Sequence, residues 1–349
     1  MEIVILVDYR GRFGSKRKEK SFRSGFDLDA LISYFELNKL SVIVLKYHEV
    51  NYRDNWQGRV VVYSSAEDSR GLYKSYIEDV VYGLSLAGAL VIPDFRYLRA
   101  HNNKVGMEIL RDVLFPDDRI SSIALGNREE LLSIMETIRY PVVLKSYEGA
   151  VSRNVRICNS KKSLLGESAI LMRSTDIKFE VKEIYRSFKR HPYKPESRYR
   201  KKAVVQNMIE GLNNDWKILV FGNKYYKLKR FNRVGDPRAS GSGNFVFDKD
   251  IDSEILNYAR SCYEKFNVPV ASLDIARDSN GPVLIEFQFV TFGTKTLEDS
   301  DHYYKFIDDK WVIVSEKAIL EREFAKSYSD YINRLYLRKN LNKHREETK

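Results

Sequence analysis

The sequence of 349 residues predicts a protein of mixed α/β and α+β class, beginning with a doubly wound parallel-sheet lobe. Three observations support this fold class. Short apolar runs alternate with helical patterns over residues 1–98, which favours parallel strands joined by crossover helices. Beyond residue 99 the alternation gives way to paired strands and separate helices. An apolar content of 43% is also sufficient for two or three lobes with cores of their own.

In the first lobe, an apolar strand over 2–7 precedes a helix over 26–37 that Asp27 is placed to cap. Strands over 41–47 and 59–65, a helix over 73–88 and a strand over 89–93 complete the pattern. The loops after the first and third strands reach the carboxyl edge of the sheet. Ligands of open α/β sheets bind at that edge, so we expect both loops to face a substrate.

The remaining chain predicts a mixed sheet and several helices. Residues 215–233 read as a hairpin, because Gly222-Asn223 is a strong turn signal between two apolar runs. The other expected elements are helices over 104–114, 252–266 and 316–340, strands over 140–146, 203–211, 270–278 and 281–290, a turn that leads into a further strand over 149–157, and a helix-rich basic stretch up to residue 202.

The net charge of +11 is concentrated locally, with seven basic residues and one acid between Arg10 and Arg23. A second basic stretch covers 173–202. Such patches attract nucleotide phosphates, acidic glycans or nucleic acid, although a solvated basic face has the same composition.

No run approaches twenty apolar residues, so no transmembrane helix is predicted, and the first residues lack the features of a signal peptide. The two cysteines cannot build a disulfide framework, which indicates a reducing cytoplasm. The five histidines lack zinc-site spacing. Standard serine-hydrolase, P-loop and dinucleotide-binding motifs are absent from the sequence.

Two lysines are candidates for binding phosphate. Lys145 ends an apolar strand and precedes a loop of small residues, whose backbone amides could turn towards an anion. Lys104 opens a helix and could reach the same phosphates. Taken alone, neither signal is specific, because a lysine at the end of a strand is usually a solvated surface residue.

A candidate metal site lies on two adjacent predicted strands. Asp274 and Glu286 stand among apolar residues, and Gln288 shares the face of Glu286 because side chains alternate along a strand. Inward-facing carboxylates require a compensating cation, and Mg²⁺ prefers such oxygen ligands. Acids on a wet sheet surface are the alternative.

Arginine presents a planar fork of donors that suits a developing acyl phosphate. Arg230 ends a hairpin strand, and Arg238 lies in a glycine-rich loop whose amides could approach an oxyanion. A flexible surface loop with incidental arginines is the other interpretation.

Taken in order, residues from about 100 to 293 resemble the ATP-grasp superfamily, which includes glutathione synthetase and the D-alanine–D-alanine ligases. The resemblance rests on six segments in the family's order: HNNK, YPVVLK, VVQNMIEG, DWKILV, DPRASGSG and DIARDSNGPVLIEFQ. It implies a lobe over 1–98, a small ATP-grasp subdomain over 99–205, a large subdomain over 206–335 and a basic, flexible tail over 336–349.

The resemblance also implies residue roles, with ATP held between the two subdomains. It assigns Lys104 and Lys145 to the phosphates, the backbones of Asn207 and Ile209 to adenine, Glu210 to the ribose, Gln206 and Ser152 to the nucleotide site, Asp274, Glu286 and Gln288 to Mg²⁺, and Arg230 and Arg238 to catalysis. Two features depart from the family. Gln288 replaces the usual asparagine, and Gly149 is the one glycine in the loop after Lys145.

The implied activity is an ATP-dependent ligase that converts a carboxylate into an acyl phosphate and joins it to an amine. The basic segments favour an anionic carboxylate substrate, such as a sugar acid or a peptide-like precursor. A phosphotransferase and a non-catalytic nucleotide- or polyanion-binding protein are the alternatives. No nucleic-acid recognition signature appears, no membrane partner is expected, and a homodimer is compatible with the resemblance.

Overall fold

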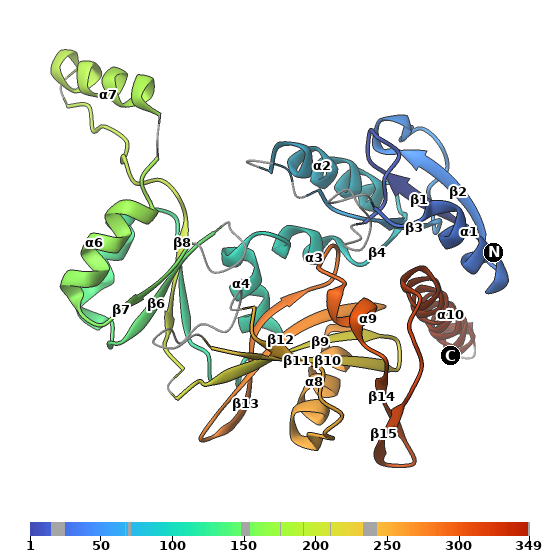
Figure 1. Cartoon of the computed structure of the whole chain (residues 1–349). Helices are drawn as coiled ribbons and strands as arrows, with labels where there is room; N and C mark the ends of the chain where they lie inside the picture. The colour runs from blue at the N-terminus through green and yellow to red at the C-terminus, as the bar shows by residue number, and fades with distance from the viewer. Residues whose placement is uncertain are drawn as a thin grey trace. The chain divides into compact units, whose positions relative to one another are not determined.

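The computed structural model describes residues 1–14, 25–66, 68, 71–147, 154–174, 176–190, 192–209, 211–232 and 243–347, with side chains up to residue 338 (Figure 1). The chain divides into two compact units. Unit 1 combines Met1–His101 with Asn213–Lys349, and unit 2 is the continuous segment Asn102–Leu212. Unit 2 is therefore inserted, in sequence, between the two parts of unit 1.

The first part of unit 1 is the predicted α/β lobe (blue in Figure 1). Its four strands are all parallel and lie in the order β2-β1-β3-β4. Asp27 caps the first helix by accepting a hydrogen bond from the backbone N–H of Ala30, as predicted. The elements are β1 (Glu2–Val7), α1 (Leu28–Leu37), β2 (Ser41–Lys46), η1 (Tyr47–Glu49), β3 (Val60–Tyr63), α2 (Leu72–Leu86), β4 (Leu90–Ile92) and α3 (Phe95–Ala100).

The second part of unit 1 contains a seven-stranded sheet in which every described pair of strands is antiparallel. The prediction of a mixed sheet was wrong, because even the neighbours that are far apart in sequence, Asn214–Phe221 with Val270–Asp278 and Lys224–Phe231 with Tyr303–Ile307, run antiparallel. Its path is β13-β12-β9-β10-β14-β15, with β11 paired to β10. The strands are β9 (Asn214–Phe221), β10 (Lys224–Phe231), β11 (Phe245–Val246), β12 (Val270–Asp278), β13 (Gly281–Gln288), β14 (Tyr303–Ile307) and β15 (Lys310–Val314).

Three helices accompany this sheet: α8 (Ser253–Phe266), α9 (Lys295–Asp299) and α10 (Leu320–Glu347). The last helix begins four residues later than the pattern predicted and continues to Glu347, through most of the segment for which we predicted a flexible tail. One apolar core joins both parts of unit 1. Ile3 and Ile5 of β1 pack in the same cluster as Leu219 of β9 and Phe324 and Tyr328 of α10.

Unit 2 is built on a four-stranded antiparallel sheet in the order β5-β8-β6-β7. One face carries Leu144 and Val205 into an apolar core with Leu131 and Leu164 of the covering helices. Its elements are α4 (Lys104–Leu114), β5 (Ser122–Leu125), α5 (Arg128–Ile134), η3 (Met135–Thr137), β6 (Val142–Ser146), β7 (Val155–Cys158), α6 (Lys161–Leu171), α7 (Ile177–Lys189) and β8 (Ala203–Asn207). The sequence analysis did not predict β5 or α5.

Cys158 is buried in unit 2 and Cys262 in unit 1. Among the described residues, no helix combines the length and the apolar character that crossing a membrane requires. The longest helix, α10, is rich in charged residues along its whole length.

Candidate functional site

Lys145 lies near the end of β6, in unit 2, on the sheet face opposite the apolar core. Its side chain is largely buried, and its Nζ lies 4.0 Å from Oε1 of Glu108 on α4. Gln206 of β8 donates from Nε2 to the same Glu108 oxygen at 3.2 Å. A carboxylate beside a lysine favours the charged ammonium form and restricts where its head can lie. This arrangement presents a positioned cation rather than a freely solvated one.

Glu108 is itself fixed by a fully buried arginine one turn further along α4. Arg111 Nε contacts Glu108 Oε2 at 2.9 Å, and Arg111 NH1 contacts Asp118 Oδ2 at 3.0 Å. Burial opposes the charge on Arg111, but the two carboxylates outweigh it and raise the pKa of the guanidinium. The buried cluster therefore contains two cations and two anions, counting Lys145.

The backbone brings the two predicted phosphate lysines into neighbouring positions. The backbone N–H of Lys104, the first residue of α4, donates to the carbonyl of Tyr147 just after β6, at 2.9 Å. Asn103 caps this helix by accepting from the backbone N–H of Gly106. The start of α4 and the end of β6 are thus joined directly, so Lys104 and Lys145 belong to one region of unit 2.

The strand predicted to hold adenine is β8 with the residues that follow it. The backbone N–H of Asn207 donates to the carbonyl of Ser121 at 3.0 Å, and its side-chain oxygen accepts from the N–H of Ser121 at 2.7 Å. Ile209 follows, half-buried. Glu210 and Ser152, also assigned to the nucleotide, lie outside the described residues.

The predicted metal residues come together on one face of the unit 1 sheet. Asp274 of β12 lies directly opposite Glu286 of β13 in the antiparallel register. Gln288, two residues further on, donates from Nε2 to Oε1 of Glu286 at 3.3 Å. Its carbonyl oxygen is the group that could bind a metal ion. The two carboxylates and one amide thus form a continuous set of oxygen ligands.

Two cations neutralise Asp274 from the side of β12 that faces away from β13. Lys217 of β9, its cross-strand neighbour, contacts Oδ1 at 3.3 Å, and Arg230 of β10 contacts Oδ2 at 2.9 Å. Burial would raise the pKa of Asp274, but Arg230 and Lys217 together hold it below its usual range. Asp274 is therefore ionised over the physiological range, as a metal ligand must be.

Arg230 has a different environment from the one predicted for a phosphate-binding residue. It makes a bidentate pair with Asp215 of β9, at 2.6 and 2.8 Å, in addition to its contact with Asp274. Although burial disfavours the charged guanidinium, the two aspartates raise the pKa of Arg230. Its donors are thus directed at protein carboxylates. Arg238, the other predicted catalytic residue, lies outside the described residues.

The oxygen ligands on β12 and β13 are compatible with Mg²⁺, which binds proteins through one or two carboxylates and completes its shell with water and phosphate oxygens. Within the described part of the chain, histidine, cysteine, aspartate and glutamate side chains form no group of three or more that could hold a metal ion alone.

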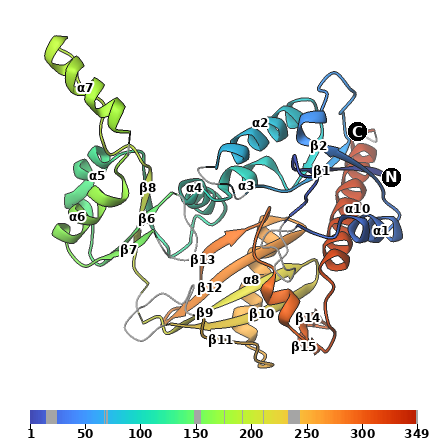
Figure 2. The ribbon, with the colours of Figure 1, turned by 45° about the horizontal axis from the view of Figure 1, so that its top comes forward.

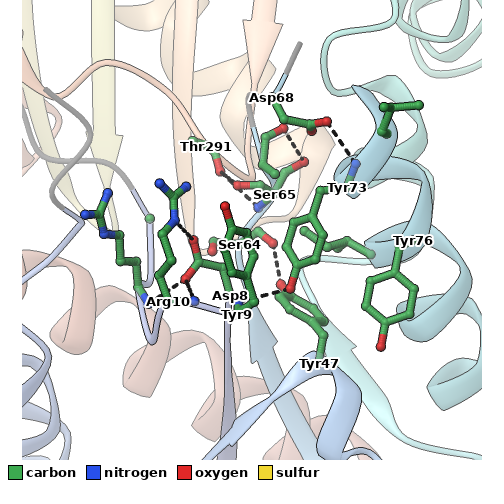
Figure 3. Close-up of a pocket in the computed structure, with 15 residues that line it drawn as sticks. Asp8, Tyr9, Arg10, Tyr47, Ser64, Ser65, Asp68, Tyr73, Tyr76 and Thr291 are labelled. Atoms are coloured by element: carbon green, nitrogen blue, oxygen red, sulfur yellow. Dashed lines mark hydrogen bonds and ion pairs between the residues drawn. The ribbon is translucent and has the colours of Figure 1, made fainter. Parts of the chain in front are cut away.

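A pocket of about 510 Å³ opens within unit 1 at the carboxyl ends of β1 and β3 (Figure 3). Arg10 and Arg12, the described part of the predicted basic arm, line it together with Asp8. Asp8 Oδ1 accepts from the backbone N–H groups of both arginines at 2.8 and 2.9 Å. These bonds hold the loop in a tight turn with Arg10 and Arg12 at the pocket. The remainder of the basic segment Arg10–Arg23, residues 15–23, lies outside the described residues.

The opposite wall of the pocket is aromatic and polar. The hydroxyl of Tyr73 on α2 accepts from the backbone N–H of Tyr9 at 3.1 Å, and the Tyr47 hydroxyl donates to the carbonyl of Ser64. Thr291 reaches the pocket from the segment after β13. Its hydroxyl accepts from the N–H of Ser65 at 3.1 Å (Figure 3).

Thr291 places the pocket near the candidate metal ligands within the same unit. It is three residues beyond Gln288, so the chain between them spans at most about 10 Å. The sequence analysis did not single out Asp215, Lys217, Glu108 or Thr291. The segment DWKILV contained the first two, but only the register of β9 with β10 and β12 shows what they contact.

No protein-family model matches the chain, and no curated protein sequence matches it. Solved structures do match. An ATP-grasp RimK domain protein from Sphaerobacter thermophilus is 13% identical, with a TM-score of 0.50 over 94% of this chain and 98% of that one. D-cycloserine synthetase DcsG is 12% identical, with a TM-score of 0.51 over 95% and 99%.

A third similar structure is the ADP complex of the N5-carboxyaminoimidazole ribonucleotide synthetase purK. It is 10% identical and covers 86% of this chain and 73% of its own, with a TM-score of 0.50. At these identities the similarity concerns the fold. It agrees with the motif order read from the sequence and with the α/β lobe and two antiparallel sheets described above. The chain therefore has the fold of the ATP-grasp superfamily.

Proposed function

We propose that this protein is an ATP-dependent ligase that activates a carboxylate as an acyl phosphate and joins it to an amine. The observation that carries the proposal is the ligand set on β12 and β13. Asp274, Glu286 and Gln288 form a metal-compatible face, and three residues later the same segment reaches a pocket lined by arginines. Metal ligands beside an anion-attracting pocket suit phosphoryl transfer to a carboxylate.

In this proposal unit 2 binds the nucleotide. Lys145 and Lys104 contact the phosphates, and Glu108 positions the Lys145 ammonium. Asn207 and Ile209 pair with adenine. The backbone N–H of Asn207 already donates to Ser121, so in this proposal Asn207 contacts adenine through its carbonyl oxygen. Mg²⁺, when bound, would supply positive charge against the oxygens of the transferring phosphoryl group.

The pocket of unit 1 holds the carboxylate substrate. Arg10 and Arg12 provide the positive charge that attracts an anion, and the tyrosine wall provides a surface for its uncharged part. A carboxylate oxygen attacks the γ-phosphorus and ADP leaves. An amine then attacks the acyl carbon, a proton is lost from its nitrogen, and inorganic phosphate leaves as the amide forms.

Arg230 acts in this scheme as a positioning residue. It holds Asp274 ionised and oriented on the metal-facing side, while Asp215 fixes the guanidinium from the other side. Arg238, in the glycine-rich loop, remains our candidate for stabilising the oxyanion of the second step.

The decisive experiment measures ADP release against a panel of carboxylates and amines, supplied singly and in pairs. A ligase releases ADP in proportion to amide only when both substrates are present. A phosphotransferase releases ADP with one acceptor and forms a stable phosphorylated product. Absence of ADP release across the panel, combined with tight nucleotide binding, would contradict the proposal in favour of a binding protein.

The substrate pocket can be tested separately with the double variant Arg10→Gln/Arg12→Gln. We expect the KM for the carboxylate to rise about tenfold and the KM for ATP to stay within about twofold. The effect should shrink as salt rises, because exposed charges are screened over about 10 Å at 0.1 M ionic strength. Arg53→Gln, on an exposed loop of the same lobe, is the matched control. Equal changes in both KM values would place the arginines outside the substrate site.

A further inference from the structure

Helix α7 of unit 2 carries a row of apolar side chains that solvent reaches. Phe188 is 84% exposed and Ile177 is 74% exposed, and Val181, Ile184 and Tyr185 are also exposed. Their spacing of three and four residues places all five on one side of the helix. We refer to these five residues as the α7 stripe. Figures 1 and 2 show no other element of unit 2 alongside this helix.

The opposite side of α7 is anchored to the chain around it. Glu183 is buried and accepts hydrogen bonds from Arg186 at 2.7 Å and from the backbone N–H of Glu196 at 3.0 Å. The Tyr193 hydroxyl donates to the same carboxylate. Arg186 belongs to the same helix, whereas Tyr193 and the Glu196 N–H tie this side of α7 to the segment that follows it. The α7 stripe lies on the side of the helix opposite these bonds.

Because the α7 stripe is apolar and exposed, we expect another molecule to cover it. A helix of thirteen residues is only marginally stable alone, and contact through an apolar face is what normally stabilises it. Contiguous exposed apolar patches on soluble proteins commonly mark interaction sites. Scattered exposed apolar residues do not need this explanation, but five on one helix face do.

The charges beside the α7 stripe indicate what covers it. At 100° per residue, Lys178, Lys182 and Lys189 all fall along one edge, and Lys189 lies over the Tyr185 ring at 5.0 Å. The other edge is formed by Glu180, which pairs with Arg173 at 3.2 Å. The helix therefore presents one apolar row with a row of lysines along one edge and the Glu180–Arg173 pair at the other.

We propose that α7 docks an acidic amphipathic helix of a partner protein. The partner's apolar face covers the α7 stripe, and a row of its carboxylates lies along the lysine edge. A lipid surface fits less well, because interfacial helices carry cations on their polar face while Glu180 here borders the apolar row. A second copy of α7 in an antiparallel pair would bring one lysine edge towards the other, and the vesicle and self-association outcomes below test these two alternatives. This docking surface is independent of the nucleotide and metal residues.

The test uses a synthetic helical peptide with leucine at helical spacing and glutamate along one edge, labelled for fluorescence anisotropy. We expect it to bind the full-length protein, and Val181→Glu/Phe188→Glu to weaken binding at least about tenfold. Ile170→Glu is the matched control, because Ile170 is 70% exposed on α6 of the same unit. That variant should bind within about twofold of the unmodified protein.

The contribution of charge to peptide binding is tested by reversing the charges on α7 and on the peptide. Lys178→Glu/Lys182→Glu should weaken the acidic peptide about tenfold, and a peptide with lysine in place of its glutamates should bind this variant better than the unmodified protein. Failure of the acidic peptide to bind, or equal binding to Val181→Glu/Phe188→Glu, overturns the proposal. So does binding to anionic phospholipid vesicles without peptide binding, or self-association that Val181→Glu/Phe188→Glu abolishes.

Discussion

Each unit contains a cluster of two cations and two anions. The central residue of the cluster is an anion in unit 2 and a cation in unit 1. In unit 2, the carboxylate of Glu108, held by a buried arginine, sits beside Lys145. In unit 1, the buried cation Arg230, held by Asp215, sits beside Asp274. A further charged residue lies next to each cluster. It is the cation Lys104 in unit 2 and the anion Glu286 in unit 1.

In both units a buried charge of one sign lies beside a charge of the other sign, and under our proposal this neighbouring residue contacts the ligand. Unit 2 presents cations, which suits phosphate. Unit 1 presents carboxylates, which suits a metal ion. Each cluster is balanced internally, so neither unit has to bury a net charge for its site to exist.

The largest expected effect is a loss of Mg²⁺-dependent turnover when the candidate metal ligands of unit 1 are removed. Asp274→Ala and Glu286→Ala should each lower Mg²⁺-dependent turnover at least about a thousandfold, because the metal loses a direct carboxylate ligand. Steady-state ADP release over a magnesium titration measures this. A normal magnesium dependence in both variants would make the strand pair structural.

Lys145→Ala should reduce turnover by about two to three orders of magnitude while the magnesium dependence stays unchanged. Glu108 keeps Arg111 and Gln206 as partners in this variant, so the unfolding temperature without ligand should barely change. Nucleotide titration calorimetry and thermal unfolding give the two readouts. Wild-type affinity for ATP would remove Lys145 from the phosphate site.

Arg111→Leu should destabilise unit 2 by about 3–5 kcal/mol, since it leaves the carboxylates of Glu108 and Asp118 buried without their cation. All three tryptophans belong to unit 1, so their fluorescence reports on that unit while circular dichroism reports on both. Urea unfolding should show the two signals separating. Arg156→Leu, which breaks a half-exposed pair with Glu167, is the control, with a change below about 1 kcal/mol.

Gln288→Asn should have the smallest effect, a loss of activity of several-fold with a raised magnesium requirement. The shorter side chain also loses its reach to Glu286, to which Gln288 donates in the structure. Activity measured at limiting and saturating magnesium separates the two contributions. An unchanged rate at limiting magnesium would mean that Gln288 does not touch the metal.

The sequence was sufficient to predict the strands and helices that carry the site, because apolar periodicity, Asp27 and the Gly222-Asn223 turn are local signals. It also predicted that Asp274 and Glu286 would be neighbours. The partners of Arg230 could not be predicted, since they depend on the register of three strands. Glu108 and Arg111 were missed because charged residues on a helix normally face water. The positions of Tyr73 and Thr291 in the pocket depend on contacts between distant segments.

The shared core of unit 1 has a consequence for the order in which the protein acquires structure during translation. β1 is synthesised about three hundred residues before Phe324 and Tyr328, its neighbours in that core. Unit 2, by contrast, is one uninterrupted segment and all its strands are complete long before α10 is made. Unit 2 can therefore fold before α10 is available to cover the apolar surface of the first lobe. Contacts of such high sequence separation form slowly, so a truncation that removes α10 should leave a nascent lobe that chaperones retain.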